Sequence, residues 1–411
     1  MAISRRRFLG NGLGFVSLSM AMPTFLAQAA RAATPTGPNG SKILVVLELS
    51  GGNDALNMVV PFADPMYRKL RPSIGIKEAD ALGLGGKLGL HPAMGQLKAM
   101  FDKGRVSVLP GVGYPNPNRS HFESMDIWQS GDPTRNPDRS GWLARGLDAQ
   151  GHPMGQHSLG GVALGGSLPL ALWTQQSALP VIGRGDDFGF NGGMLDRDGA
   201  KDALQKMYAG GTVANGHQEF VRAAGAGVFE DSETIRNAIK KYDYKAGAAA
   251  QYPDSDLSRS LQTVSKLITG GAPTRVYYLN MGGYDTHANQ PGSHQYLLGT
   301  LSDATAAFLR DIELQGRMND VMLMTFSEFG RRVQENASSG TDHGAAGSMF
   351  VMGGKVRGGV AGTHPDLADL DDGDLKFTQD FRAVYSTVLQ GWLGVAPKQV
   401  IPGDWKALSF V

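Results

Sequence analysis

Apolar runs of strand length alternate with amphipathic helical segments along most of this 411-residue chain. Residues 43–49 are apolar at every position except Glu48, which is the pattern of a central strand buried on both faces. The alternation is strongest after residue 250, and alternating strands and helices predict a doubly wound sheet. The sequence therefore predicts an α/β fold with a mostly parallel sheet flanked by helices.

The apolar patterns also place the individual elements. We expect further strands at residues 106–109, 275–280, 321–326 and 348–352, and helices at residues 120–129, 255–268, 294–314 and 381–393. Residues 150–250 are less regular, with helical stretches around 199–208, 217–224 and 231–244. We interpret this region as a cap or insertion within one large domain that spans residues 34–411.

Four polar clusters stand where strand-like runs open into loops. They are Asn53-Asp54, Asp285-Thr286-His287, Glu328 with Arg331, and Asp342-His343. Ligands of α/β proteins bind at the carboxyl ends of the strands, so we expect these side chains to meet there. Mixed carboxylate and imidazole ligands suit zinc or a similar divalent ion. The clusters therefore favour a metal-dependent hydrolase with one or two divalent metal ions, zinc being the first choice.

Each cluster also has a purely structural interpretation. Asp54 would serve equally well as the cap of a following helix, a position where Asp is preferred. The other clusters would suit polar turns, or a simple ion pair between Glu328 and Arg331. Purely structural roles for all four clusters at once are less convincing, because the clusters recur at corresponding strand ends.

A hydroxyl nucleophile is expected at Ser120, where a Gly-, Pro- and Asn-rich loop opens into a helix. The helix dipole and a nearby cation would favour its alkoxide, although the same position suits an ordinary N-cap. The adjacent His121 would contact either the substrate or the metal. We expect Arg119 or Arg331 to clamp an anionic ester and Asn53 to donate to a developing oxyanion.

Residues 1–33 have the features of a removable export sequence. The pair Arg5-Arg6 is followed by Phe8-Leu9, a weakly apolar stretch, and small-residue sites that end at Ala29 and Ala32. The alternative is a disordered basic tail. We expect the twin-arginine translocation machinery to recognise this segment, with cleavage near Ala29 or Ala32. The mature protein would then be periplasmic or extracellular, without stable membrane insertion.

Charge and cysteine content exclude several classes of function. The chain has 39 Lys and Arg against 38 Asp and Glu, and four of the arginines lie in the first 33 residues. The remainder is mildly acidic, so we expect no nucleic-acid partner. Because the chain has no cysteine, thiolate metal ligands and a cysteine nucleophile are excluded.

Four segments resemble those of one protein family. Residues 47–54, 118–122, 282–287 and 326–331 are similar, in the same order, to the domain-of-unknown-function 1501 family of exported bacterial proteins. That family is grouped with the alkaline-phosphatase-like, or sulfatase-like, superfamily. In that superfamily two divalent metals lie at the carboxyl edge of a central sheet, and a hydroxyl nucleophile at a helix N-terminus faces them. The resemblance implies this fold and an ester hydrolase.

The resemblance also implies individual metal ligands. Asp54 resembles the acid that binds one metal, and Asp285 with His287 resembles the pair that binds the other. The spacing here is Asp-Thr-His, whereas the superfamily usually has Asp-x-x-x-His.

The second half of the ligand set departs further from the superfamily. Glu328 stands where an aspartate is common, and Phe329 replaces the histidine that usually follows it. His343 resembles the last metal histidine, and Asp342 is either a ligand or a partner that orients His343.

Two functions remain open from the sequence. The first is an exported hydrolase of an anionic ester, small or polymeric, in which an unmodified Ser120 suits phosphoesters better than sulfate esters. The alternative is a non-catalytic, metal-stabilised binding or assembly protein of the cell envelope, which the Phe329 replacement favours. Metal content together with turnover of a generic aryl phosphate separates the two.

Overall fold

The computed structural model describes residues 42–134, 140–151, 159–174, 179–183, 199, 202–203, 206–208 and 216–411. The predicted export sequence, residues 1–33, and part of the predicted cap region lie outside the described residues. Among the described residues, no helix has both the length and the apolar composition that crossing a membrane requires.

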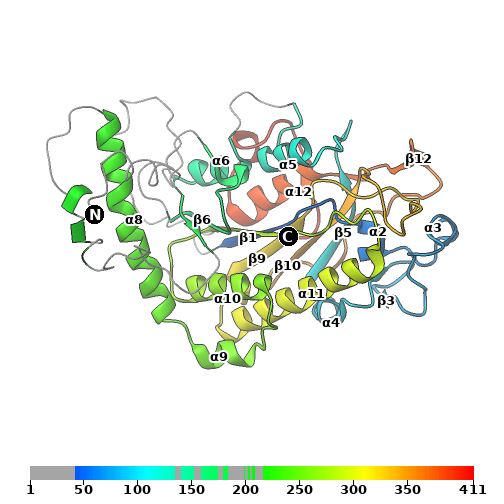
Figure 1. Ribbon diagram of the computed structural model, residues 1–411, viewed down its shortest axis with the longest axis horizontal. Coiled ribbons are helices and arrows are strands. Elements are labelled where there is room, and N and C mark those ends of the chain that lie inside the picture. The colour runs from blue at the N-terminus through cyan, green and yellow to red at the C-terminus, as the bar shows by residue number, and fades with distance from the viewer. Residues whose placement is uncertain are drawn as a thin grey trace, which may run out of the picture.

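The described chain is organised around a nine-stranded sheet (Figure 1). In spatial order its strands are β11 (Gly359–Val360), β5 (Val106–Gly113), β10 (Gly347–Gly353), β9 (Val321–Phe326), β1 (Ile43–Leu49), β8 (Val276–Met281), β6 (Gly161–Leu164) and β7 (Val181–Ile182), with β14 (Gln379–Asp380) also paired to β5. β10 runs antiparallel to β5 and β9, whereas the other neighbouring strands of this sheet pair in parallel. The predicted mostly parallel α/β fold is confirmed.

β1 lies inside the sheet, between β9 and β8. Successive side chains of a strand point to opposite faces, so an apolar residue at nearly every position buries both faces. Val45, Leu47 and Leu49 join one core cluster, whereas Leu44 and Val46 join another. The continuous apolar run of the sequence thus reflects helices on both sides of the sheet.

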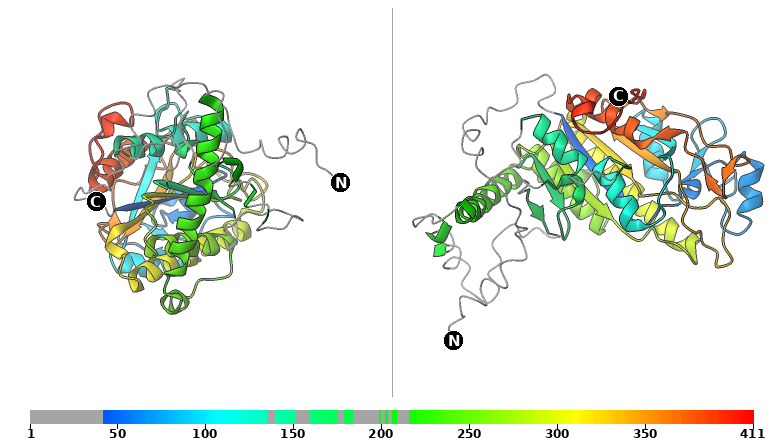
Figure 2. Two further views of the ribbon diagram at one scale, coloured as in Figure 1. Left: turned by 90° about the vertical axis from the view of Figure 1, so that its left-hand side faces the viewer. Right: turned by 90° about the horizontal axis from the view of Figure 1, so that it is seen from above.

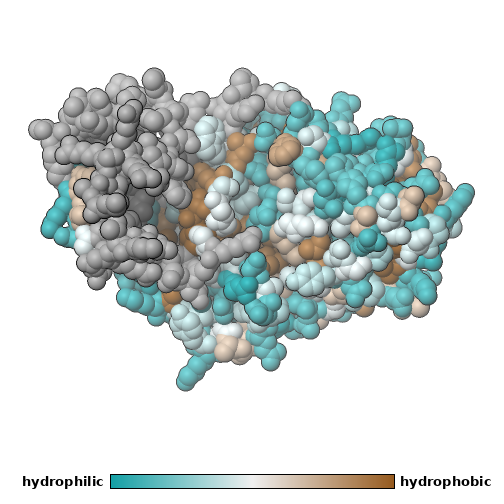
Figure 3. Space-filling view, in the orientation of Figure 1, coloured by the Kyte–Doolittle hydropathy of each residue, from teal (hydrophilic) through white to brown (hydrophobic). Residues whose placement is uncertain are grey.

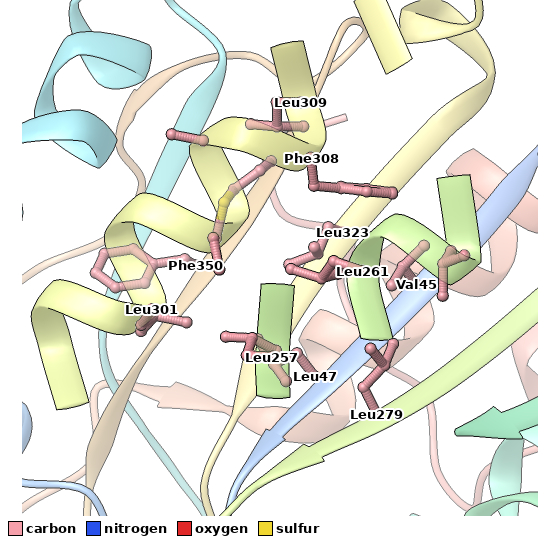
Figure 4. Close-up of a cluster of buried hydrophobic side chains, with 14 of the residues drawn as sticks. Val45, Leu47, Leu257, Leu261, Leu279, Leu301, Phe308, Leu309, Leu323 and Phe350 are labelled. Carbon is pink, nitrogen blue, oxygen red and sulfur yellow. The ribbon is translucent and has the colours of Figure 1, made fainter. Parts of the chain in front are cut away.

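Helices cover both faces of the sheet (Figures 1 and 2). On one side lie α4 (Gly95–Asp102), α10 (Asp256–Thr269) and α11 (Gln290–Leu314), and on the other lie α5 (His121–Ser130), α6 (Trp142–Ala149), α12 (Phe381–Thr387) and the π-helix η5 (Val388–Leu393). Figure 4 shows Leu257 and Leu261 of α10 and Leu301 and Phe308 of α11 packed toward Leu47 and Leu323 of the sheet.

The remaining elements are shorter. α2 (Ala55–Met58) and α3 (Pro65–Leu70) follow β1, and the strands β2 (Val59–Val60), β3 (Leu82–Gly83) and β4 (Gly89–Leu90) form a small separate sheet. β12 (Leu370–Asp371) and β13 (Asp374–Leu375) form a hairpin. α9 (Tyr244–Ala249) leads into α10, and the 3-10 turns are η3 (Leu170–Leu172), η4 (Met318–Asp320) and η6 (Pro397–Gln399).

The predicted cap region differs from expectation in two ways. β6 and β7 belong to it, yet they extend the central sheet beyond β8. The two helices expected at 217–224 and 231–244 form one helix, α8 (Gly216–Lys240). Two glycines, Gly225 and Gly227, interrupt the helical pattern of the sequence, but a glycine costs a helix only about 1 kcal/mol and packing against α10 can offset this.

Candidate metal centre

Polar side chains from distant segments meet at one edge of the central sheet. β1, β8 and β9 run in parallel, so their carboxyl ends share that edge, and the β9–β10 connection lies there because β10 runs antiparallel to β9. Within this connection Arg331 and His343 face each other in an isolated antiparallel bridge. The pairing explains how His343 returns to the end of β9, next to Asp285, which follows β8.

Asp285 is the centre of the group. Its Oδ1 atom lies 3.0 Å from His287 Nε2 and 3.3 Å from His343 Nε2, and its Oδ2 atom lies 3.6 Å from His121 Nε2. Arg331 Nη2 donates to the same Oδ1 at 2.7 Å. One carboxylate therefore joins three imidazoles and a guanidinium.

Each of the three imidazoles has an oxygen acceptor at its Nδ1 atom. The pairs are His121 with Glu328 Oε1 at 2.8 Å, His343 with the Arg119 carbonyl at 2.9 Å, and His287 with Asp342 Oδ1 at 3.3 Å. Carbonyl and carboxylate oxygens accept hydrogen bonds, so each Nδ1 carries the proton. In a neutral ring the Nε2 atom is then unprotonated and presents a lone pair.

The three Nε2 atoms converge on the Asp285 carboxylate. His121 Nε2 is buried and has no hydrogen-bond partner among the described residues, and the Nε2 atoms of His287 and His343 lie 3.0 Å apart. Lone pairs that converge on a carboxylate repel one another, and a cation between them removes this repulsion. Three imidazole nitrogens and one carboxylate are a donor set that zinc accepts. The residues therefore fit a divalent cation.

The electrostatics keep the donor atoms in the forms that a metal requires. Burial alone would raise the pKa of Asp285, but Arg331 and the neighbouring histidines hold it below its ordinary value. Burial, together with the charge of Arg331, lowers the pKa of His343, although its contacts with Arg119 and Asp285 act the other way. An ionised carboxylate and a neutral imidazole are the metal-binding forms.

Phe329 packs against two of the imidazole rings. Its ring centroid lies 4.9 Å from that of His121 and 4.7 Å from that of His343, and the side chain is buried. An apolar ring therefore stands beside the cluster at the position where the sequence resemblance leads one to expect a further histidine.

Ser120 lies between two residues that contact this cluster. The carbonyl of Arg119 accepts from His343 on one side, and His121 faces Asp285 on the other. Ser120 occupies the N-cap position of α5, yet its side chain makes no capping hydrogen bond. Asn118 fixes the backbone just before the helix, because its Oδ1 accepts from the Ser120 N–H at 2.8 Å and its Nδ2 donates to the Glu123 carboxylate at 2.6 Å. The exposed Ser120 hydroxyl therefore does not serve as a helix cap.

Several predicted site residues have other surroundings. The structure does not bring Asp54 into the cluster, because its carboxylate caps α2 and pairs with Arg71 Nη1 at 2.6 Å, with no exposed side-chain surface. Asn53 is also buried, and its amide contacts Met58 and His294, so it does not offer a donor to an oxyanion. These two interpretations of the sequence require correction.

Glu328 and Arg331 belong to the site in roles other than those predicted. Glu328 is buried and accepts from Gly51 N–H at 2.9 Å as well as facing His121, so it orients a ligand and is not itself exposed to one. The Arg331 side chain has no exposed surface and donates to the carbonyls of Gly52 and Thr341 and to Asp285. It therefore stabilises the carboxylate and cannot clamp an ester.

The sequence analysis missed two charged residues that pair with predicted site residues. Arg71 compensates Asp54, and Asp374 pairs with Arg119. Arg71 stands in no polar cluster and at no strand end, and Asp374 belongs to an acidic run at residues 371–374 that does not indicate which arginine it pairs with.

The family of the chain follows from comparison with known sequences. The family model described as "Protein of unknown function (DUF1501)" matches residues 41–389. The chain belongs to this family. The match confirms the resemblance on which the sequence-based assignment rests, and it includes every residue of the cluster described above. A comparison with curated proteins finds no significant match.

The solved structures found by comparison share little sequence with this family member. A protein in the alkaline phosphatase superfamily from Vibrio parahaemolyticus is 10% identical, with a TM-score of 0.40 over 88% of this chain and 70% of that one. The lipoteichoic acid synthase LtaP from Listeria monocytogenes is 8% identical, with a TM-score of 0.35 over 88% and 74%. A 2-O GAG sulfatase is 9% identical, with a TM-score of 0.37 over 90% and 73%. Function therefore has to be inferred from the side chains of this chain.

Proposed function

We propose that this protein hydrolyses an anionic ester at a site that holds one divalent cation, zinc being the first choice. His121, Asp285, His287 and His343 would hold the cation. The observation that carries the proposal is the His121 Nε2 atom, which is buried, faces Asp285 and has no hydrogen-bond partner within the described part of the chain. A cation at this position would supply the positive charge that lowers the pKa of a nearby hydroxyl and stabilises negative charge on an ester.

The surrounding residues fix this ligand set. Glu328, Asp342 and the Arg119 carbonyl hold one ring each, which sets its tautomer and its orientation. Outer partners of this kind raise the basicity of metal-binding histidines and reduce the entropy lost on binding. A single group with this compact arrangement, His121, Asp285 and His343, is present among the described residues, with His287 beside it at Asp285, which supports one ion in preference to two.

Ser120 is the proposed nucleophile. Its hydroxyl is exposed, is not used as a cap, and stands at the N-terminus of α5 between Arg119 and His121. The helix N-terminus favours negative charge on this oxygen. Ser120 Oγ would displace the alcohol of the ester and lose its proton to solvent, and water would then release the acid from the serine.

The chemistry of Ser120 favours phosphoesters as the substrate class. A hydroxyl attacks phosphorus without prior modification, whereas the sulfatases that depend on formylglycine require an oxidised side chain. The site is half-exposed at Asp285 and Asp342, so both small and polymeric esters can approach it.

The test combines metal content with turnover. Chelator-free protein should contain about one zinc per chain, and it should hydrolyse an aryl phosphate or an aryl sulfate. Ser120→Ala should retain the zinc and lose turnover by about 10³-fold or more. Zinc-free wild-type protein would defeat the metal proposal. Full turnover by the Ser120→Ala variant would show that the nucleophile is not Ser120.

A binding or assembly protein of the cell envelope is the second candidate. The buried Phe329 favours it, because this ring stands beside His121 and His343 where a further ligand is expected. This function predicts a zinc-loaded wild-type protein that turns over neither ester class. Zinc removal would then lower the free energy of unfolding without affecting any catalysis.

We also propose that the protein is exported through the twin-arginine translocation machinery, with cleavage near Ala29 or Ala32. The support is the order of the arginine pair, apolar stretch and small residues in the sequence. Changing Arg5 and Arg6 to Lys should leave the precursor in the cytoplasm of a bacterial host. Normal export of this double variant would refute the route.

A further inference from the structure

The β12–β13 hairpin brings a group of acidic residues to the site. Its turn residues Asp372 and Gly373 have positive φ values of 48° and 83°, the conformation of a tight hairpin turn with an Asp-Gly sequence. The Gly373 carbonyl accepts from the Val333 N–H at 3.4 Å, and the Asp372 carbonyl accepts from Arg332 Nη1 at 2.6 Å. The hairpin is thus attached to the β9–β10 connection, which carries the candidate metal ligand His343. Figure 3 shows a mainly hydrophilic surface in the region of this hairpin.

Asp374 of this hairpin is a buried carboxylate whose charged partners are two arginines. Only 3% of its side chain is exposed, and it pairs with Arg119 Nη2, while Arg332 Nε lies 3.8 Å away. Burial raises the pKa of Asp374 although both arginines act to lower it. Burying a charged carboxylate costs solvation free energy, and a buried ion pair often does not repay this cost in stability. A role in holding Arg119 is a better explanation for its burial.

Arg119 is well placed to contact a substrate. It precedes Ser120, its own carbonyl accepts from His343, and 39% of its side chain is exposed. Among the described residues no hydrogen bond from Arg119 Nε or Nη1 is formed, so these donors are available. Arg331, the other arginine that the sequence suggests as a clamp, is buried and donates to backbone carbonyls and to Asp285.

We propose that Arg119 binds the non-bridging oxygens of the anionic ester and that Asp374 is its positioning residue. The inference rests on the proposed function and names the residue pair that recognises the anion. Asp374 would hold Arg119 Nη2 and leave the other edge of the guanidinium directed away from the hairpin. An arginine that is already ordered loses less conformational entropy when it binds an oxyanion.

The experiment measures the binding of inorganic phosphate to the zinc-loaded protein by calorimetry. It compares the wild type with Arg119→Ala, Asp374→Ala and the double variant. Arg119→Ala should weaken phosphate binding by about tenfold or more, because it removes charge-assisted hydrogen bonds. Asp374→Ala should weaken binding only when Arg119 is present, because Asp374 acts through that arginine.

The double variant separates positioning from simple electrostatics. Removal of a negative charge would by itself strengthen phosphate binding, and by a similar factor with or without Arg119. That result would overturn the positioning role of Asp374, and wild-type affinity in Arg119→Ala would overturn the role of Arg119. Zinc-loaded wild-type protein that binds no phosphate and no sulfate would instead refute the proposed function itself.

Two controls protect the interpretation. Asp369→Ala removes an exposed acid that pairs with Lys376 beside the same hairpin, so it should leave phosphate affinity unchanged. Zinc content and the near-UV circular dichroism spectrum should be unchanged in each variant. If Asp374→Ala does not fold, Asp374→Asn provides the same comparison, with a smaller loss that again requires Arg119.

Discussion

Asp54 and Arg71 form an ion pair with 2.6 Å between Oδ2 and Nη1, and neither side chain has any exposed surface. Burial alone would raise the pKa of Asp54, but Arg71 and Gln290 hold it below its ordinary value. Arg71 also donates to the carbonyls of Val333 and Arg332, so this pair joins the segment after β1 to the β9–β10 connection.

Replacement of Asp54 should therefore destabilise the fold and leave the metal site intact. Asp54→Ala strands a buried arginine, and we expect a loss of about 3–5 kcal/mol in the free energy of unfolding by urea. Asp64 is a matched control, because it caps α3 as Asp54 caps α2, and Asp64→Ala should cost about 1 kcal/mol. Loss of zinc from folded Asp54→Ala would show that Asp54 is a ligand after all.

Replacement of Glu328 should weaken metal binding without removing a ligand. Glu328→Gln leaves a side chain of the same shape, but its amide can present an N–H to His121 Nδ1 and so reverse the tautomer. We expect zinc affinity to fall by about 10–100-fold in competition with a chromophoric chelator. Glu335→Gln is the control, since Glu335 accepts from the backbone of Ser73 and Ile74 outside the cluster. Unchanged zinc affinity in Glu328→Gln would remove the orienting role.

The sequence predicted the sheet better than the directions of the site side chains. β1 and β9 match their predicted bounds, because short apolar runs between turn residues admit few alternatives. A position at a strand end indicates the edge of the sheet, but the following backbone decides where the side chain points. After β1, Gly51 and Gly52 adopt positive φ values and α2 begins at once, so Asp54 caps that helix.

The histidines were predictable as a group for a different reason. His121 begins α5, whereas His287 and His343 lie in loops, and all three stand at the same edge of the sheet. The antiparallel pairing of Arg331 with His343 brings the last of them back to Asp285. The partners of buried charges could not be predicted, because Arg71 and Asp374 are selected by tertiary packing. A single sequence does not show which distant residue carries the opposite charge.

Gly51 should be essential for the position of Asp285. A Cβ atom at Gly51 would lie 2.5 Å from the backbone nitrogen of Asp285, which is closer than real contacts allow, and the φ value is 120°. Gly51→Ala should lower zinc affinity by about tenfold or more and cost about 1–3 kcal/mol of stability. Gly359→Ala is the control, because its φ value of 123° gives the same strain with no atom within 4 Å. If both variants bind zinc equally well, the close approach to Asp285 does not matter.

Stability should fall with acid because of a buried histidine. His294 is buried against Asn53, and burial lowers its pKa from 6.5 to about 4, although the charge of Asp54 acts the other way. The ring centroid of His91 lies 6.2 Å from that of His294, and burial lowers the pKa of His91 as well. The positive charge of Arg71 lowers the pKa of His294 further. In the unfolded chain a histidine takes up its proton near pH 6.5.

The sign of the effect follows from this difference. Between pH 6.5 and about 4 the unfolded chain binds a proton at His294 that the folded protein does not, so the free energy of unfolding decreases as the pH falls. The full contribution is present above pH 6.5, and its loss should reach about 3 kcal/mol near pH 4. Burial raises the pKa values of Glu48 and Asp374, and this makes the free energy of unfolding increase as the pH falls. The contribution of His294 is therefore isolated by comparing wild type with His294→Gln. The free energy of unfolding is measured in urea as a function of pH, with chelator present. The glutamine of His294→Gln can still donate to Asn53. Between pH 6.5 and about 4, the free energy of unfolding of this variant should decrease by about 3 kcal/mol less than that of wild type. Parallel curves for the two proteins would mean that the folded and unfolded states bind a proton at His294 alike, so that burial does not lower its pKa.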